Sequence, residues 1–139
     1  MKAIIYFSMS KMKNCEKIAE EFEGDLFEIK PEGKPIKFVP FQMIVYGFKT
    51  VFNRNVKYVD PNINFELYDE IVLVSPVWTG KVNIFMKKYL ENVLFTSKEV
   101  TIVGSCGGGY KGYFESYDKV LNPSNNVVNR VMYIKDKLV

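Results

Sequence analysis

The sequence contains no histidine and only two cysteines, Cys15 and Cys106. Without histidine, Ser-His-Asp and Cys-His catalysis, histidine-ligated metal sites and axial-histidine haem ligation are all excluded. Two cysteines that lie far apart in the chain build neither a disulfide framework nor a four-ligand zinc site. We therefore expect no metal site.

Long apolar runs and a strong charge excess are also missing. No apolar run approaches the ~20 residues of a membrane helix, so we expect no membrane span. The N-terminal segment Met1–Phe7 is too short for a signal peptide, which makes the cytoplasm the expected compartment. The net charge of +3 is too weak to indicate nucleic-acid binding. With 139 residues, 47% of them hydrophobic and 25% charged, the chain is expected to form a single domain over residues 1–139.

Short apolar runs alternate with segments of helical spacing. The predicted strands are Ala3–Phe7, Asp25–Lys30, Ile71–Ser75, Val100–Gly104 and Val127–Ile134. The predicted helices are Cys15–Phe22, Pro40–Phe52, Val82–Val93 and the short Phe114–Leu121. Continuous apolar strands are typical of parallel sheets that are buried on both faces. This βαβαβαβαβ order predicts a doubly wound α/β fold.

The sequence stops at Val139, shortly after the last predicted strand. A closing C-terminal helix is therefore expected to be missing, which would leave one sheet face partly uncovered. Because uncovered parallel sheets are rare, self-association into a homodimer is one hypothesis for covering this face.

In doubly wound folds, ligands bind at the carboxyl ends of the strands. The segment after the first strand carries hydroxyls at Ser8 and Ser10 and charges at Lys11 and Lys13, and it enters a helix near Asn14. Hydroxyls and backbone N–H groups at a helix N-terminus suit an anion. The alternative is a plain turn that is capped by Asn14.

Two further segments follow the third and fourth strands. Pro76–Gly80 holds Trp78, the only tryptophan, whose indole could stack on a flat ring or simply pack over the core. Cys106–Gly109 includes three consecutive glycines, and Tyr110 and Tyr113 follow them. Such a backbone can approach a ligand closely, and the alternative is an ordinary flexible loop.

Three stretches together resemble the flavodoxin family, in particular its short FMN proteins. KAIIYFSMSKMKNCEKIAEEF is similar to the first strand and phosphate loop, and IVLVSPVWTGKVNIFMKKYLENV to the third strand, a ring-binding loop and the following helix. TIVGSCGGGYKGYFE is similar to the fourth strand and the second ring-binding loop. The resemblance covers nearly the whole chain in order, and it implies a flavodoxin-like five-stranded parallel sheet in the order 2-1-3-4-5 with noncovalently bound FMN.

The resemblance also implies roles for individual residues. The FMN phosphate would be held by Ser8, Ser10, Lys11, Met12, Lys13, Asn14 and Cys15. The flavin ring would be bordered by Pro76, Val77, Trp78, Thr79, Gly80, Cys106, Gly107, Gly108, Gly109 and Tyr113. Trp78 would stack on or shield the ring, and Tyr113 would cover its other face. The family's phosphate loop usually ends Thr-Gly-Asn-Thr. Here Lys13 replaces the glycine and Cys15 replaces the last threonine. A cysteine thiol is a weaker hydrogen-bond donor than a threonine hydroxyl.

A flavodoxin-like protein is expected to carry one or two electrons between a reductase and an acceptor enzyme, with the redox chemistry supplied by the flavin. Two alternatives stay open. One is a flavin-dependent reductase that acts directly on a quinone, a disulfide or a tetrapyrrole. The other is a binding module that has kept the fold and lost FMN.

The charge distribution bears on the partner. Acidic residues crowd into Glu16–Glu28, whereas Lys30–Lys57 is basic and rich in aromatic residues. The charged residues of this basic segment are Lys30, Lys34, Lys37, Lys49, Arg54 and Lys57, with Glu32 as the only acidic one. Such a surface suits an acidic partner protein or a flat small molecule with carboxylates, and the alternative is a solvated face over ordinary core aromatics.

Overall fold

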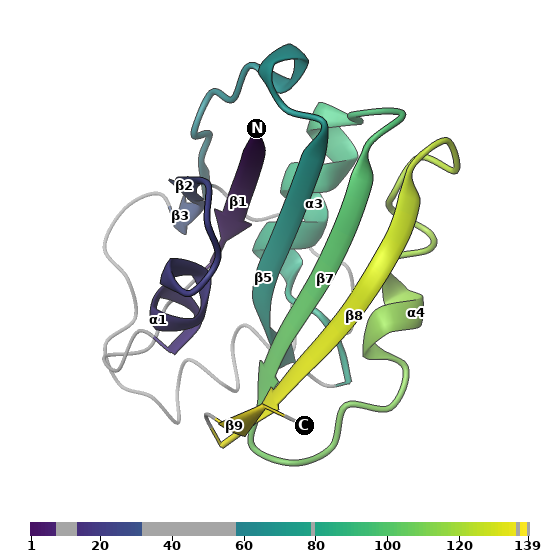
Figure 1. Cartoon of the computed structure of the whole chain (residues 1–139). Helices are drawn as coiled ribbons and strands as arrows, with labels where there is room; N and C mark the ends of the chain where they lie inside the picture. Colours follow the sequence, from purple (N-terminus) through teal and green to yellow (C-terminus); the bar gives the residue numbers. More distant parts are fainter. Residues whose placement is uncertain (8–13, 32–57, 79, 136, 139) are drawn as a thin grey trace.

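The computed structural model describes residues 1–7, 14–31, 58–78, 80–135 and 137–138 (Figure 1). The predicted helix Pro40–Phe52 lies outside these residues, as do Ser8–Lys13 and Thr79. The described elements are β1 (Lys2–Tyr6), α1 (Asn14–Glu20), β2 (Asp25–Glu28), β3 (Lys30–Pro31), β4 (Tyr58–Val59), the 3-10 helix η1 (Phe65–Leu67), β5 (Glu70–Trp78), β6 (Lys81–Val82), α3 (Ile84–Val93), β7 (Glu99–Cys106), α4 (Tyr113–Ser116), β8 (Asn126–Ile134) and β9 (Lys137–Leu138).

The central sheet confirms the predicted doubly wound, flavodoxin-like topology. Its strands follow the order β2-β1-β5-β7-β8-β9, in which the first five run parallel. Numbered among themselves, these five parallel strands have the order 2-1-3-4-5. Two short antiparallel strands extend the sheet, because β6 pairs with β5 and β9 pairs with β8.

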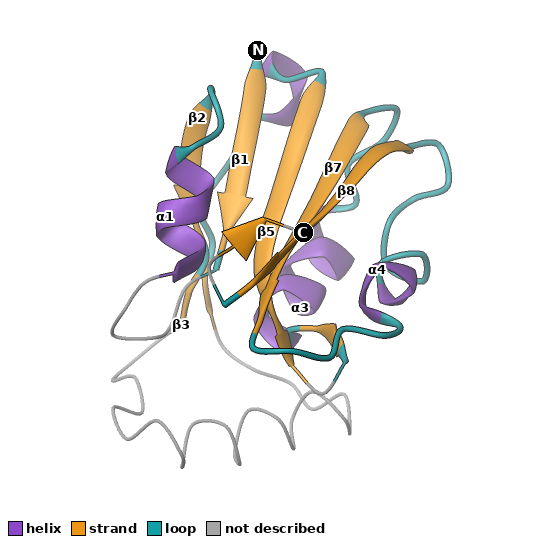
Figure 2. Cartoon of the chain, turned by 60° about the horizontal axis from the view of Figure 1, so that its bottom comes forward, coloured by secondary structure: helices purple, strands orange, loops and turns teal. Residues whose placement is uncertain are grey.

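The two faces of the sheet carry separate apolar clusters, as alternating side chains of buried strands require. On one face, Ile5, Leu73 and Ile102 belong to the larger cluster, which also includes Phe85 and Tyr89 of α3. On the other face, the strand residues of the smaller cluster are Ile4, Tyr6, Val72, Val74 and Val103, and the α1 residues are Cys15, Ile18 and Ala19. Figure 2 shows α1 on one side of the sheet and α3 and α4 on the other.

On the α1 face, α1 is the only helix that the described residues place against the sheet, and β7 and β8 run clear of it in Figure 1. Tyr133 of β8 is only partly buried here, and its hydroxyl donates a hydrogen bond of 3.0 Å to the Glu21 carboxylate, just after α1. This contact joins residues 112 positions apart and ties β8 to the α1 side.

β5 is longer than predicted. The sequence predicts a strand that ends at Ser75 and a loop from Pro76, but β5 continues to Trp78 and turns through Gly80 into β6. The prediction of a loop at Pro76 is therefore wrong. β1 pairs with β5 only as far as Val74, so the missing N–H of Pro76 leaves no gap in the β1 ladder.

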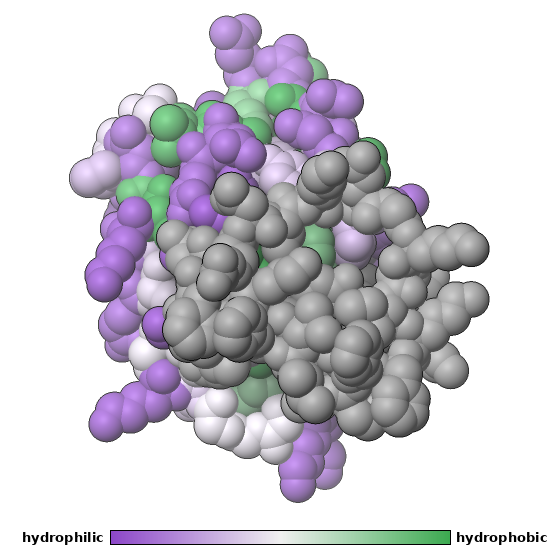
Figure 3. Space-filling view, turned by 180° about the vertical axis from the view of Figure 1, so that it is seen from behind, coloured by the Kyte–Doolittle hydropathy of each residue, from purple (hydrophilic) through white to green (hydrophobic). Residues whose placement is uncertain are grey.

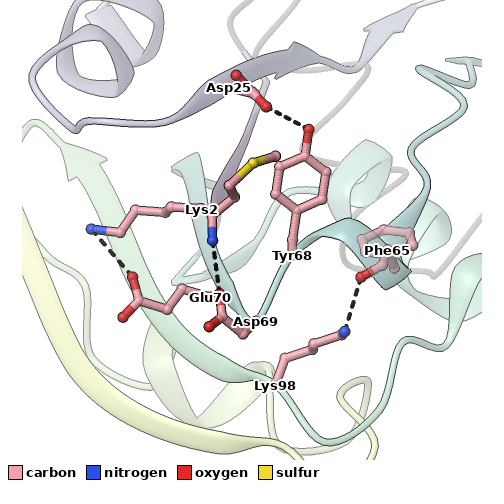
Figure 4. A network of polar contacts seen from close by, with 8 residues as sticks. Lys2, Asp25, Phe65, Tyr68, Asp69, Glu70 and Lys98 are labelled. Carbon is pink, nitrogen blue, oxygen red and sulfur yellow. Dashed lines mark hydrogen bonds and ion pairs between the residues drawn. The ribbon is translucent and has the colours of Figure 1, made fainter.

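At the amino edge of the sheet, polar contacts join neighbouring strands (Figure 4). The N-terminal amine lies 3.1 Å from the Asp69 carboxylate, and the Lys2 ammonium lies 3.6 Å from Glu70. The Tyr68 hydroxyl donates to Asp25 at 2.6 Å, and the Lys98 ammonium donates to a backbone carbonyl at 2.9 Å. These contacts lie at the edge of the sheet opposite the candidate site.

Candidate functional site

Three neighbouring strands end together at the carboxyl edge of the sheet. β1, β5 and β7 are adjacent, so the chain segments that leave them start side by side. The rings of Phe7 and Trp78, which follow β1 and end β5, meet edge to face at 5.7 Å between centroids. This edge is where a doubly wound sheet binds its ligands.

Trp78 rests on two phenylalanine rings. Phe7 stacks on Phe85 of α3 at 4.8 Å with an interplanar angle of 10°. The indole of Trp78 meets Phe85 edge to face at 6.4 Å. Trp78 therefore packs over the rim of the core while staying only partly buried, and stacking on a flat ring stays a prediction.

The segments after β5 and β7 touch through two glycines. A Cβ atom on Gly80 would lie 3.1 Å from the Lys111 carbonyl oxygen, and one on Gly112 would lie 3.6 Å from the Gly80 carbonyl oxygen. Both glycines have positive φ angles, 74° and 87°. Glycine is favoured at such angles, so the close approach of the two segments depends on these residue types. No pattern in the sequence indicates that Gly112 brings these two segments together.

The Gly107–Gly109 stretch is open to solvent. A Cβ atom added at any of the three positions would meet nothing within 4 Å, and all three residues are exposed. Among the described residues, no protein group accepts a hydrogen bond from the backbone N–H groups of these glycines. The stretch thus presents a row of donors that no side chain of the described residues covers.

Cys106 borders this row. Its thiol is partly buried, and its Sγ atom lies 3.4 Å from the Gly108 carbonyl oxygen and 3.7 Å from the Met132 Sδ atom. The thiol therefore contacts its own loop and β8.

Tyr113 does not fit the expected role of covering a ligand ring. Its side chain is fully buried, and its hydroxyl is hydrogen-bonded to the Ser75 Oγ atom at 2.9 Å and to the Tyr117 hydroxyl at 3.2 Å. The prediction is wrong because α4 begins at Tyr113 and points this side chain into the core. The loop instead leaves Tyr110 partly exposed, with its ring edge to face with Phe114 at 6.2 Å.

The buried tyrosines have a consequence at alkaline pH. Burial raises the pKa of Tyr117 to about 12 and the pKa of Tyr113 well above its usual value. Their folded-state pKa values thus exceed the unfolded value of about 10, so the stability they contribute is complete below about pH 10. The contribution of Tyr117 is lost as the pH rises from about 10 to about 12, by about 1.4 kcal/mol per pH unit, and that of Tyr113 is lost in the same direction.

We therefore expect urea unfolding to show a steep loss of stability as the pH rises above about 10. Tyr117→Phe removes one titrating hydroxyl and should make this loss shallower. Phe114→Leu is the control, because it changes a side chain of the same helix without removing a hydroxyl, and it should leave the pH dependence of the loss unchanged. An equal loss in the Tyr117→Phe and wild-type proteins would contradict this account.

At the predicted phosphate loop, the structure describes only Asn14 and Cys15. Asn14 begins α1, and Cys15 is 3% exposed in the cluster under that helix. Ser8, Ser10, Lys11, Met12 and Lys13 lie outside the described residues, so the phosphate assignment stays a prediction. Most of the basic segment also lies outside them, since its described part is only Lys30–Pro31.

The described residues form neither a metal-binding group nor a membrane-spanning helix. Within the described ranges, no group of three or more Cys, Asp or Glu side chains is placed to hold a metal ion. None of the described helices has the length and apolar character needed to cross a membrane.

No protein-family model matches the chain, and no curated protein matches it by sequence. Solved structures do match it. A flavoprotein from Lactobacillus acidophilus NCFM, solved in complex with FMN, is 24% identical, with a TM-score of 0.73 over 94% of this chain and 91% of that one. A protein from Bacteroides eggerthii DSM 20697, whose assignment as a flavoprotein is provisional, is 18% identical, with a TM-score of 0.71 over 94% and 86% of the two chains.

A third structure, from Bacteroides uniformis ATCC 8492 and also provisionally assigned as a flavoprotein, is 15% identical, with a TM-score of 0.66. This match covers 98% of the present chain and 92% of the Bacteroides uniformis chain. At these identities, the likeness establishes the flavodoxin-like fold.

Proposed function

We propose that this chain binds FMN noncovalently and carries electrons between a reductase and an acceptor. The observation that carries the proposal is the row of uncovered N–H donors at Gly107–Gly109, at the edge where this fold binds ligands. The structural neighbour from Lactobacillus acidophilus, which was solved in complex with FMN, supports the choice of ligand.

The residues at this edge fit a flavin. A flavin ring is flat and carries hydrogen-bond acceptors along one side, which suits a glycine backbone that offers donors without side chains. Two aromatic side chains at this edge are partly exposed. They are Trp78, which ends β5, and Tyr110, which follows β7. They would border the ring, while the segment from Ser8 to Cys15 would hold the phosphate.

Each group of residues would have a separate task. FMN, when bound, supplies the redox chemistry. Gly107–Gly109 would orient the ring through backbone N–H groups, and Phe7 and Phe85 would fix Trp78 beside it. No side chain of the chain has to act as nucleophile or general base. This division of tasks favours an electron carrier over an enzyme with its own catalytic side chains.

Titration of the FMN-free full chain with FMN and with riboflavin tests the proposal. We expect flavin fluorescence to be quenched, and we expect FMN to bind at least about tenfold more tightly than riboflavin, since charge-assisted hydrogen bonds to phosphate contribute about 1.5–3 kcal/mol. Equal affinity would remove the predicted phosphate loop from the site.

Unchanged fluorescence at high protein concentration would overturn FMN binding and favour a binding module that has lost the cofactor. If FMN binds, steady-state turnover with NADH or NADPH and a quinone distinguishes a reductase from a carrier. A carrier is expected to show no turnover until a separate reductase is added.

A further inference from the structure

The carboxyl ends of β5, β7 and β8 are basic, whereas the acidic residues Glu16 and Glu28 lie at the β1 and β2 side of the same edge, near Tyr6. The described residues at the ends of β5, β7 and β8, which are 76–78, 80–82, 106–112 and 133–135, contain three lysines and no acidic residue. These carboxyl-edge lysines are Lys81, Lys111 and Lys135, and all three are exposed. We propose that they form the docking surface for an acidic electron-transfer protein, an inference that rests on the proposed function.

Backbone contacts hold the three lysines around the glycine loop. Lys81 directly follows Gly80, which packs against the Lys111 carbonyl oxygen. The Lys135 N–H group donates a hydrogen bond of 3.0 Å to the Cys106 carbonyl oxygen. The lysine backbones are therefore fixed beside Cys106–Gly112, while their side chains extend into solvent.

Further lysines lie behind this edge. The pKa of Lys87 on α3 is lowered chiefly by burial, and also by the positive charges of Lys88, Lys81 and Lys119. Of the acidic residues nearby, Glu91 lies 3.4 Å from the Lys88 ammonium, whereas Glu115 and Asp118 beside α4 are exposed. The α3 and α4 side thus carries both charge signs, with Glu91 raising the pKa of Lys87 against the effect of the neighbouring lysines, so the basic surface is confined to the carboxyl edge. In Figure 3, which views the molecule from behind, hydrophilic side chains project at the top, the left and the bottom of the view.

Acidic charge gathers elsewhere on the molecule. Glu20, Glu21 and Glu23 lie at the end of α1 or just after it, on the sheet face opposite α3 and α4. Asp69 and Glu70 lie at the amino edge, where the N-terminal amine and Lys2 pair with them (Figure 4). A protein with this asymmetry orients an acidic partner toward its basic edge before contact. That orientation would bring the partner to the edge proposed to hold the flavin.

The first test needs no FMN. The isotope-labelled full chain is titrated with a short poly-L-glutamate peptide, and amide shifts are followed by NMR at low and at physiological salt. We expect shifts at residues 80–82, 106–112 and 133–135 and weaker binding at higher salt. Shifts centred elsewhere would overturn the proposal.

Charge-matched variants make this test specific. Lys81→Gln/Lys111→Gln should weaken poly-L-glutamate binding about three- to thirtyfold, the range expected for two exposed ion pairs. Lys17→Gln/Arg130→Gln removes the same charge from exposed positions on α1 and β8 and should change binding less than twofold, by about 0.4 kcal/mol or less. Equal effects of the two double variants would reduce the surface to net charge and overturn the proposal. Tighter binding of an oligothymidylate of matched length would assign it to nucleic acid instead.

The second test uses the FMN-loaded protein, reduced without oxygen and mixed with ferricyanide or with hexaamminecobalt(III). Each oxidant ion accepts one electron, so two ions reoxidise the two-electron-reduced flavin, which also releases two protons. We expect oxidation by the ferricyanide anion to slow with salt, and to slow further in Lys81→Gln/Lys111→Gln. Oxidation by the cobalt cation should show the opposite trends, and identical trends for the two ions would overturn the proposal. A protein that binds no FMN still gives a result in the first test, so the two proposals fail separately.

Discussion

Replacing Phe85 with alanine is expected to lower the free energy of unfolding by about 3–5 kcal/mol. Phe85 is 2% exposed and stacks on Phe7, so its removal leaves a cavity between α3 and the sheet. Close-packed neighbours collapse into such a space only in part, and this incomplete collapse makes the loss large. Urea unfolding followed by far-ultraviolet circular dichroism measures the change without relying on tryptophan.

The same substitution should also disturb the candidate site, because Trp78 rests edge-on against both Phe85 and Phe7. We expect Trp78 fluorescence to shift to longer wavelength and FMN to bind more weakly. Phe85→Leu keeps most of the volume and should cost less than about 1.5 kcal/mol, which provides a folded variant if the alanine protein does not fold. A loss below about 1 kcal/mol for Phe85→Ala would show that this cluster does not support the edge of the sheet.

Much of the fold is predictable because its strands are continuous apolar runs. Ala3–Phe7 and Val100–Gly104 are found within about two residues of the predicted strands, since buried parallel strands leave few positions for polar residues. Val127–Ile134 is found equally well, although β8 is largely exposed and contains Asn129 and Arg130. The order of the strands was implied by the family resemblance, because apolar runs alone do not state which strands are neighbours. The β5–β6 hairpin was missed because Pro76 is typical of a loop, and only the short reach of β1 permits a proline there.

The candidate site was predictable as a set of strand ends, but not side chain by side chain. Tyr110 and Tyr113 both follow the glycines, and sequence spacing does not indicate which of them faces the core. Gly112, with its φ of 87°, reverses the chain between them and turns Tyr113 inward. Lys135 is likewise placed beside Cys106 only by pairing between strands that are distant in sequence.

A pair of glycine substitutions is expected to separate folding from cofactor binding. A Cβ atom at Gly104 would lie 2.6 Å from the Met132 Cε atom and 2.7 Å from the Tyr113 Cε2 atom. Met132 can rotate its terminal methyl group away, but the Tyr113 ring is fixed by hydroxyl hydrogen bonds to Ser75 and to the Val103 carbonyl oxygen. Gly104→Ala should therefore cost about 1–3 kcal/mol in urea unfolding, as overpacking of a filled core does.

Gly108→Ala places the same methyl group in open space, where nothing lies within 4 Å. Its free energy of unfolding should stay within about 0.5 kcal/mol of the wild type. If the flavin ring approaches the Gly107–Gly109 N–H groups, this methyl group obstructs it, and FMN affinity should fall about three- to tenfold, the equivalent of one hydrogen bond. Wild-type affinity in Gly108→Ala would place the ring away from these donors. A loss of FMN affinity without a loss of stability would show that ligand binding, and not folding, requires glycine at this position, because the fold itself has room for a side chain there.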